Sequence, residues 1–511
     1  MSMSSLPINV DNNETNHGRR RSFLDIGGLN SINNFASSYK RAQNYMGSSF
    51  LETPFTETIS PNSSPPFGAS IDDSTLVSPI PQGYNHIKTF SFPEPDEVTS
   101  LLEEGPQSTR TSISLHHFGN STAPQTFFNS VNTLMGIGML SLPFGLKLAG
   151  WFWGSIMLAL SSVLTCITAI ILGKIIQKNP HLHTYGDIAY AFGGPTFSYF
   201  VTVIFSIDLI GASLSLILLF ADSFTILFPS INSSIFKSII VSFVFILSFF
   251  PLSILSLLSL AGIFCTLSII IVIFICGFST HIAPGSLFTP EYTNFYPLNL
   301  KSFLFSLGIF MAPWGGHPVF PELYRDMRHP SKYANCCKSS FSITFIFDYL
   351  IAVIGFLMFG VFCNDSIIKN LMGNSNYPSW VNPLICVFMG ILPISKLPLV
   401  TKPIVTVYEN IIGIPIKQDG VSVRKLLGRF VFFSLLLATS LLFNSFGQLI
   451  SFLGSLICFN ICLTLPFLFY LYFCEESNVY IKLLLKLGIL IGISGAILGT
   501  YASITMDPLE F

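Results

Sequence analysis

Two runs rich in glycine and proline interrupt otherwise hydrophobic segments, and they are the residues best suited to hold a small polar molecule. One run contains Gly136-Ile137-Gly138 and the other Pro313-Trp314-Gly315-Gly316. Glycine and proline release backbone N–H and C=O groups from helical hydrogen bonding, and glycine lets a ligand approach the main chain closely. Lipid cannot satisfy such groups, so interruptions of this kind persist only where they line a protected cavity. The pair predicts a substrate site near the middle of the membrane in a secondary transporter.

The residues predicted to bind substrate belong to these interruptions or lie beside them. They are Asn132, Thr133, Gly136, Ile137, Gly138, Phe310, Ala312, Gly315 and Gly316. An alternative interpretation is that each glycine pair only permits close packing of helices. Interruptions in corresponding positions of the two halves of the chain favour the binding site.

Ionisable residues within hydrophobic segments are candidates for proton coupling, because each costs roughly 2.5–3.5 kcal/mol at the centre of a membrane helix. Asp208 lies in the third hydrophobic segment of the chain, approximately Ser198–Phe220, where we expect it to line the cavity and attract a proton or a positively charged substrate group. Alternatively, it bonds a neighbouring serine or backbone group. Lys396 lies in the eighth segment, where its ammonium could stand in place of a sodium ion; the competing interpretation is a lysine that extends towards the interface. Asp348 is either a partner for a lysine or a capped polar residue.

His317 directly follows the second interruption. Histidine titrates between neutral and mildly acidic pH, which makes His317 a third candidate for proton coupling. The alternative is a structural histidine that bonds the carbonyl groups freed by the interruption.

The composition is that of a polytopic membrane protein. Of the 511 residues, 50% are hydrophobic and only 10% are charged, far from the balance of a soluble domain. A net charge of −1 argues against a nucleic-acid partner, which requires a clustered basic face. Cys336 and Cys337 are adjacent rather than spaced for zinc. Since no spacing typical of a nucleophile and base or of metal ligands occurs either, we expect no enzymatic activity, no metal and no cofactor.

The chain divides into a tail and a membrane domain. Residues 1–122 are rich in Ser, Asn and Pro, so we expect a disordered tail. Residues 123–505 form the transmembrane domain, and 506–511 a short C-terminus. A membrane span needs roughly 20 hydrophobic residues, so the hydrophobic stretches of this domain predict an all-α fold with about eleven transmembrane helices. The two interruptions fall in the first and the sixth of these helices. Two long hydrophobic stretches are divided at Pro251 and at Asn444-Ser445-Phe446-Gly447.

Basic residues concentrate in loops on the side of the N-terminal tail. They are Lys174, Lys178, Arg325, Arg328, Lys332, Lys338, Lys417, Arg424, Lys425, Arg429 and Lys482. The positive-inside rule therefore places the tail in the cytosol. An odd number of spans then places the C-terminus in the lumen or outside the cell.

Two sequence blocks resemble the amino acid/auxin permease family, and within it the fungal vacuolar amino-acid transporters related to vesicular inhibitory amino-acid transporters. One runs from Asn132 to Gly138 and continues through Leu146-Lys147-Leu148-Ala149-Gly150-Trp151; the other is Gly316-His317-Pro318-Val319-Phe320-Pro321-Glu322-Leu323-Tyr324-Arg325-Asp326-Met327-Arg328-His329-Pro330. The resemblance implies eleven spans with a LeuT-like 5+5 inverted repeat plus one extra helix. It also implies movement of neutral amino acids across acidified organelle membranes, in exchange or together with protons.

The implied substrate matches the chemistry of the interruptions. An amino acid presents a carboxylate, which backbone N–H groups at a half-helix N-terminus would bind, and an ammonium, which carbonyl groups at a half-helix C-terminus would bind. We therefore expect a proton-coupled transporter of neutral amino acids in the vacuolar membrane, with lipid and protons as further partners. The alternative is an amino-acid sensor at the vacuole that signals through its cytosolic tail.

A sorting motif lies in the tail. Glu97-Val98-Thr99-Ser100-Leu101-Leu102 has the acidic dileucine form that clathrin adaptors bind on cytosolic tails. Such a motif is an address read by a receptor rather than a membrane anchor. We expect Glu97, Leu101 and Leu102 to direct the protein to the vacuole.

Overall fold

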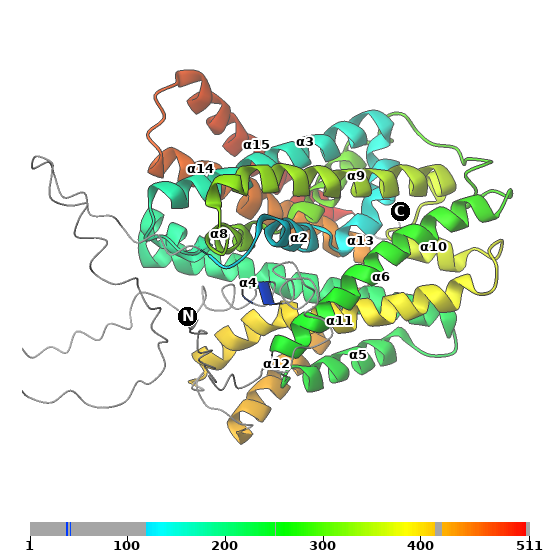
Figure 1. The fold of residues 1–511 in the computed structure, drawn as a ribbon. Coiled ribbons are helices and arrows are strands. Elements are labelled where there is room, and N and C mark those ends of the chain that lie inside the picture. Colours follow the sequence, from blue (N-terminus) through cyan, green and yellow to red (C-terminus); the bar gives the residue numbers. More distant parts are fainter. Residues whose placement is uncertain (1–36, 39–40, 42–118, 251, 414–421, 507–511) are drawn as a thin grey trace, which may run out of the picture. The chain divides into compact units, whose positions relative to one another are not determined.

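The computed structural model describes residues 37–38, 41, 119–250, 252–413 and 422–506, and within this part every regular element is a helix (Figure 1). The helices are α2 (Ala123–Leu134), α3 (Leu142–Lys178), α4 (Tyr185–Leu227), α5 (Ser233–Leu247), α6 (Leu252–Ser279), α7 (Leu300–Met311), α8 (Phe320–Arg325), α9 (Tyr333–Phe359), α10 (Ile367–Gly373), α11 (Val381–Ile411), α12 (Val423–Leu442), α13 (Phe446–Phe452), α14 (Leu465–Phe473) and α15 (Val479–Thr505). An all-α membrane fold is therefore confirmed.

Nine helices in the described part are long and apolar enough to cross a membrane, fewer than the eleven predicted. One difference is α5, whose 15 residues fall short of a span by length. The other is α3, which joins the end of the first predicted span to the second through Gly150 at φ 73°. Only glycine adopts this conformation readily. The carbonyls of Asn294 and Phe295 accept hydrogen bonds from the two N–H groups after this turn. The count of eleven stays a prediction, whereas the divisions before α6 and before α13 are confirmed.

The first interrupted helix begins in a well-capped α2. Thr122 and Gln125 form a reciprocal capping box at its start, which satisfies two of the backbone groups that a helix end leaves unpaired. The helix ends at Leu134, a 3-10 segment follows over Ile137–Ser141, and α3 begins at Leu142. The interruption therefore falls at the predicted glycines.

The second interrupted helix consists of α7, two short 3-10 segments and α8. The segment Ala312–Trp314 follows α7, and His317–Val319 precedes α8, with Gly315 and Gly316 between them. We call the side of the membrane where α2 begins and α8 ends the near side, and the opposite side, where α4 ends and α10 lies, the far side.

A π-helical segment, Leu453–Thr464, connects α13 to α14 and crosses α7 at very short range. A Cβ atom on Gly454 would lie 1.9 Å from the carbonyl oxygen of Gly308, and one on Gly308 would lie 2.0 Å from that of Ser451. The Ser451 hydroxyl donates a hydrogen bond to the Phe305 carbonyl at 2.7 Å. The two glycines thus allow backbone-to-backbone contact beside the second interruption.

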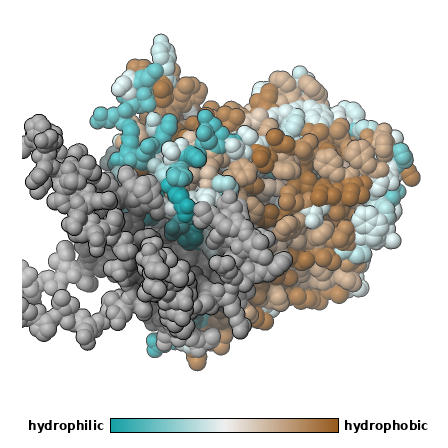
Figure 2. Space-filling view, viewed as in Figure 1, coloured by the Kyte–Doolittle hydropathy of each residue, from teal (hydrophilic) through white to brown (hydrophobic). Residues whose placement is uncertain are grey.

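Exposed side chains form a surface suited to lipid. On α3 the exposed Phe152, Ile156, Leu160, Val163 and Ile167 recur at helical spacing. Figure 2 shows hydrophobic residues over most of the visible face of the described chain, with hydrophilic residues gathered towards the near side. This is the arrangement that a bilayer requires.

The glycine crossing yields a prediction for stability. Gly454→Ala should lower the free energy of unfolding by about 1–3 kcal/mol, because overpacking forces the two backbones apart. Thermal unfolding of the purified protein in detergent would measure the loss. Gly373→Ala is the matched control, since a Cβ atom on Gly373 would meet nothing within 4 Å. An unchanged midpoint for Gly454→Ala would contradict the close crossing.

Candidate functional site

The two interruptions lie against each other inside the helical domain. A Cβ atom on Gly138 would lie 3.4 Å from the Pro313 nitrogen and 3.6 Å from the Ala312 carbonyl carbon. One on Gly316 would lie 2.7 Å from the Thr133 side chain. Helical segments that end at the same place bring backbone donors of one and acceptors of the other to a common point. The two interruptions therefore face each other in the structure.

A cavity of about 230 Å³ opens beside this junction. Its wall contains eight of the nine residues predicted to bind substrate: Asn132, Thr133, Gly136, Ile137, Gly138, Ala312, Gly315 and Gly316. Phe310 is not part of the wall. Its ring is fully buried and faces α3, where it lies 3.0 Å from the position of a Cβ atom on Gly145 and 3.2 Å from that of one on Gly154.

Lys396 reaches the first interruption from α11. Its Nζ donates a hydrogen bond to the Met135 carbonyl oxygen at 2.9 Å, and Met135 is the C-cap residue directly after α2. None of the ion pairs in the described part of the chain involves Lys396. The ammonium therefore neutralises the negative end of the half-helix dipole, as a bound cation would.

Asp208 also lines the cavity, as part of a stripe on α4. The stripe comprises Phe205, Asp208, Leu209, Ala212, Ser215 and Leu216, which recur along one face of the helix. Apart from Asp208, sequence reasoning did not identify these residues. Their helical spacing around Asp208 was the signal that could have revealed them.

Further residues missed from the sequence complete the apolar wall. Leu399 and Val400 follow Lys396 on the same face of α11, and Ile450, Leu453 and Cys458 come from α13 and the π-helical segment. Among the lining residues in the described part of the chain, Asp208 is the only carboxylic acid and Lys396 the only basic side chain. The cavity thus combines one group of each charge with a mainly hydrophobic wall.

His317 lies outside the cavity wall and is fully buried. Its Nε2 lies 2.9 Å from the Thr168 hydroxyl and 3.0 Å from the Thr165 carbonyl oxygen, both on α3. A carbonyl can only accept, so Nε2 carries the hydrogen, while Nδ1 has no partner among the described residues. These contacts join the second interrupted helix to α3.

Two buried carboxylates have no hydrogen-bond partner in the described part of the chain: Asp348 on α9 and Glu322 on α8. They are 1% and 0% exposed. Asp348 therefore pairs with neither Lys396 nor Lys402. Burying a carboxyl group without a partner costs far less free energy in its neutral form than in its charged form.

An ion-pair cluster lies on the far side of the cavity. Lys369 on α10 lies 2.9 Å from both Asp222 on α4 and Asp365, and Asp365 accepts a hydrogen bond from the Gly447 N–H at 3.1 Å. Burial lowers the pKa of Lys369, but the carboxylates of Asp365 and Asp222 outweigh it and hold that pKa above its ordinary value. Asp222 lies six residues beyond Leu216, or about 9 Å along α4. The cluster therefore joins α4, α10 and α13 beyond the far end of the cavity.

The sorting motif Glu97, Leu101 and Leu102 lies outside the described residues. Within the described ranges, no group of three or more His, Cys, Asp or Glu side chains is arranged to hold a metal ion.

Comparison with known proteins relates this architecture to a family. Residues 119–505 match the family described as transmembrane amino acid transporter protein. Amino acid transporter AVT1D of Arabidopsis thaliana is 28% identical over 439 residues, covering 81% of this chain and 76% of the relative. Amino acid transporter AVT1C of the same plant is 26% identical, covering 90% and 83%. The vesicular GABA transporter of Caenorhabditis elegans is 25% identical, covering 75% and 79%.

Among solved structures, the chain is similar to a manganese transporter of Eremococcus coleocola, with a TM-score of 0.46 and 13% identity over 76% of this chain and 88% of that one. The family match begins just before α2, ends with α15 and includes every segment that lines the cavity. The chain therefore belongs to the transmembrane amino acid transporter protein family.

Proposed function

We propose that this protein is a proton-coupled secondary transporter of neutral amino acids in the vacuolar membrane. The near side is then the cytosolic side, and the C-terminus lies in the lumen. The dileucine motif of the tail would act as the vacuolar address read by clathrin adaptors. The observation that carries the proposal is the junction of two interrupted helices beside a cavity that holds one acid and one base.

An amino acid has complementary groups for this junction. The first N–H groups of the 3-10 segment Ile137–Ser141 lack partners within that segment and suit a carboxylate. The carbonyl groups at the end of α7, together with Asp208, suit an ammonium. At about 230 Å³, the cavity is smaller than the roughly 300–1,000 Å³ of sites for drug-sized ligands, as a single amino acid requires.

The wall around the side chain favours a neutral substrate. Leu209, Leu216, Ile450 and Leu453 line the cavity and offer apolar surface to a substrate side chain. The charges of Asp208 and Lys396 balance each other, so the charged side chain of a substrate would find no further partner in the cavity. Burying such an unpaired charge costs several kcal/mol.

Asp208 is the best-placed carboxylate for proton coupling, because it lines the cavity and can change charge as access alternates. His317 makes its contacts with Thr165 and Thr168 on α3 instead. They favour a structural role that joins two helices, rather than the bonding of carbonyl groups freed by the interruption. Uptake of labelled neutral amino acids into proteoliposomes, with a pH gradient of either sign, tests the proposal. Accumulation that disappears with a protonophore is expected; binding without flux would contradict transport and favour a sensor.

Gly138→Val should reduce uptake to background, because its branched side chain would fill the space between the two interruptions. Gly138→Ala is the matched control. Its single Cβ atom meets Pro313 and Ala312 at 3.4–3.6 Å, an ordinary contact distance, so a substantial part of the uptake should remain. Initial uptake rates in proteoliposomes, normalised to the amount of folded protein, would show the difference. Equal uptake by Gly138→Val and wild type would exclude the proposed binding site.

Asp208→Asn should abolish accumulation driven by a pH gradient while exchange of substrate for substrate persists, because the amide keeps the size of the side chain but cannot titrate. The two assays, run on the same proteoliposomes, separate coupling from binding. If the variant accumulates substrate with unchanged pH dependence, Asp208 is structural.

Lys396→Met should lower uptake by more than tenfold, because it leaves the Met135 carbonyl and the end of α2 without a cation. Lys402→Met is the control, since Lys402 lies on the same helix but outside the cavity wall. Uptake of both variants would be compared with sodium present and absent. Full uptake by Lys396→Met would show that the ammonium is dispensable.

A further inference from the structure

The near-side ends of the two interrupted helices are joined directly. Ser121, just before α2, forms a parallel backbone bridge with Met327, just after α8. The Ser121 N–H donates to the Asp326 carbonyl at 2.6 Å, and the Arg328 N–H donates to the Ser121 carbonyl at 2.8 Å. Any relative movement of these two ends must break this bridge.

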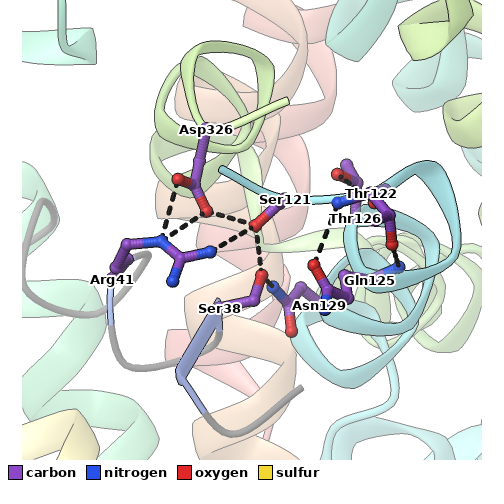
Figure 3. A network of polar contacts seen from close by, with 8 residues as sticks. All are labelled: Ser38, Arg41, Ser121, Thr122, Gln125, Thr126, Asn129 and Asp326. Atoms are coloured by element: carbon purple, nitrogen blue, oxygen red, sulfur yellow. Dashed lines mark hydrogen bonds and ion pairs between the residues drawn. The ribbon is translucent and has the colours of Figure 1, made fainter. Parts of the chain in front are cut away.

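Two residues of the N-terminal tail complete the junction. The Arg41 Nε lies 3.0 and 3.2 Å from the two carboxylate oxygens of Asp326, and a terminal guanidinium nitrogen donates to the Ser121 hydroxyl at 3.0 Å. Figure 3 shows Arg41 and Asp326 pointing towards each other, with Ser38 between Ser121 and Asn129. Tail residues therefore contact both interrupted helices at once.

The hydrogen bonds around Ser38 form a directed chain. The Ser121 hydroxyl donates to Asp326, which accepts only, so the Ser38 hydroxyl donates to Ser121. The Asn129 amide on α2 donates to Ser38 at 2.9 Å. A negative group in place of the Ser38 hydroxyl could not donate to Ser121, and only the Ser121 hydroxyl would separate it from the Asp326 carboxylate.

Burial makes these contacts energetically important. Ser38 is 0% exposed, and the Asp326 side chain is 4% exposed. The Arg41 side chain is 28% exposed, so the pair is buried mainly on the Asp326 side. Removing the guanidinium would leave the buried carboxylate of Asp326 without a compensating cation. Arg41 of the tail supplies the cation that compensates the charge of Asp326.

We propose that the tail segment carrying Ser38 and Arg41 is an intramolecular latch that docks on Ser121, Asn129 and Asp326 and restrains transport. The restraint rests on the proposed transport function. Asn132 and Thr133 at the end of α2, and Pro318 and Val319 just before α8, line the cavity. Alternating access requires these half-helices to move around the site, and the latch holds their near-side ends in one arrangement. Phosphorylation of Ser38, which adds about −1.5 to −2 charge, would release it.

A cross-link tests docking independently of transport. The hydroxyls of Ser38 and Ser121 are in hydrogen-bond contact, so cysteines at both positions would bring their sulfur atoms within reach of a disulfide. Nine of the ten native cysteines are buried, which limits competing reactions. Oxidation of full-length Ser38→Cys/Ser121→Cys should yield the linked peptides by mass spectrometry. Ser37→Cys/Ser121→Cys is the control, because Ser37 is exposed. Equal cross-linking of both pairs, or of neither, would overturn docking.

Uptake by the same proteins tests the restraint. Cross-linked Ser38→Cys/Ser121→Cys should lose most of its uptake and regain it with reductant. Ser38→Glu, which places a negative charge against Asp326, should raise the initial rate several-fold, whereas Ser37→Glu should match wild type. Undiminished uptake by the cross-linked protein, or wild-type rates for Ser38→Glu, would overturn the latch.

A charge exchange completes the test. Arg41→Asp should raise uptake as Ser38→Glu does, and Arg41→Asp/Asp326→Arg should restore the wild-type rate by reversing the ion pair. If the Arg41→Asp/Asp326→Arg protein is folded but its uptake rate stays at that of Arg41→Asp, while the Ser38→Cys/Ser121→Cys protein still forms its cross-link, the role of the ion pair is overturned. If wild type takes up no amino acid at all, the proposed function fails, and the cross-link alone decides whether the segment docks.

Discussion

Lipid offers no partner to a backbone N–H or C=O group, and this constraint governs the arrangement around the two interrupted helices. The protein meets it by placing the interruptions against each other, so that the backbone groups freed at Gly138 and Pro313 face protein and cavity rather than lipid. Lys396 satisfies the carbonyl at the end of α2. The crossing of Gly308 and Gly454 then allows the neighbouring π-helical segment to cover the junction.

Polar contacts tie the helices together on both sides of this junction. On the far side Lys369 joins α4 to α10, with Asp365 extending the contact to α13. On the near side the backbone bridge at Ser121 joins α2 to α8, with Arg41 compensating the charge of Asp326. Such contacts are discrete: they are either made or broken, unlike the continuous packing of apolar side chains. They are therefore natural points at which a helical domain of this kind changes state.

The sequence predicted the interruptions well because glycine and proline act locally, whatever surrounds them. It also located Asp208 and Lys396, since a charge inside a hydrophobic segment is conspicuous. It did not place the Phe310 ring, because an aromatic residue on a mainly apolar helix carries no signal of which side faces the cavity. The contacts of His317 with Thr165 and Thr168 depend on distant helices. Ser38 and Arg41 lie in a polar tail without periodicity, so only the structure could connect them to Asp326.

The bond between Lys396 and the Met135 carbonyl means that the cation at the end of α2 is tethered by its own side chain. A tethered group has an effective concentration set by the length of its linker, which is independent of the solution on either side of the membrane. A free metal ion at the same carbonyl would bind according to its concentration and would bring the energy of its gradient into the cycle. With a lysine in this position, the end of α2 is neutralised whatever salts the surrounding solutions contain.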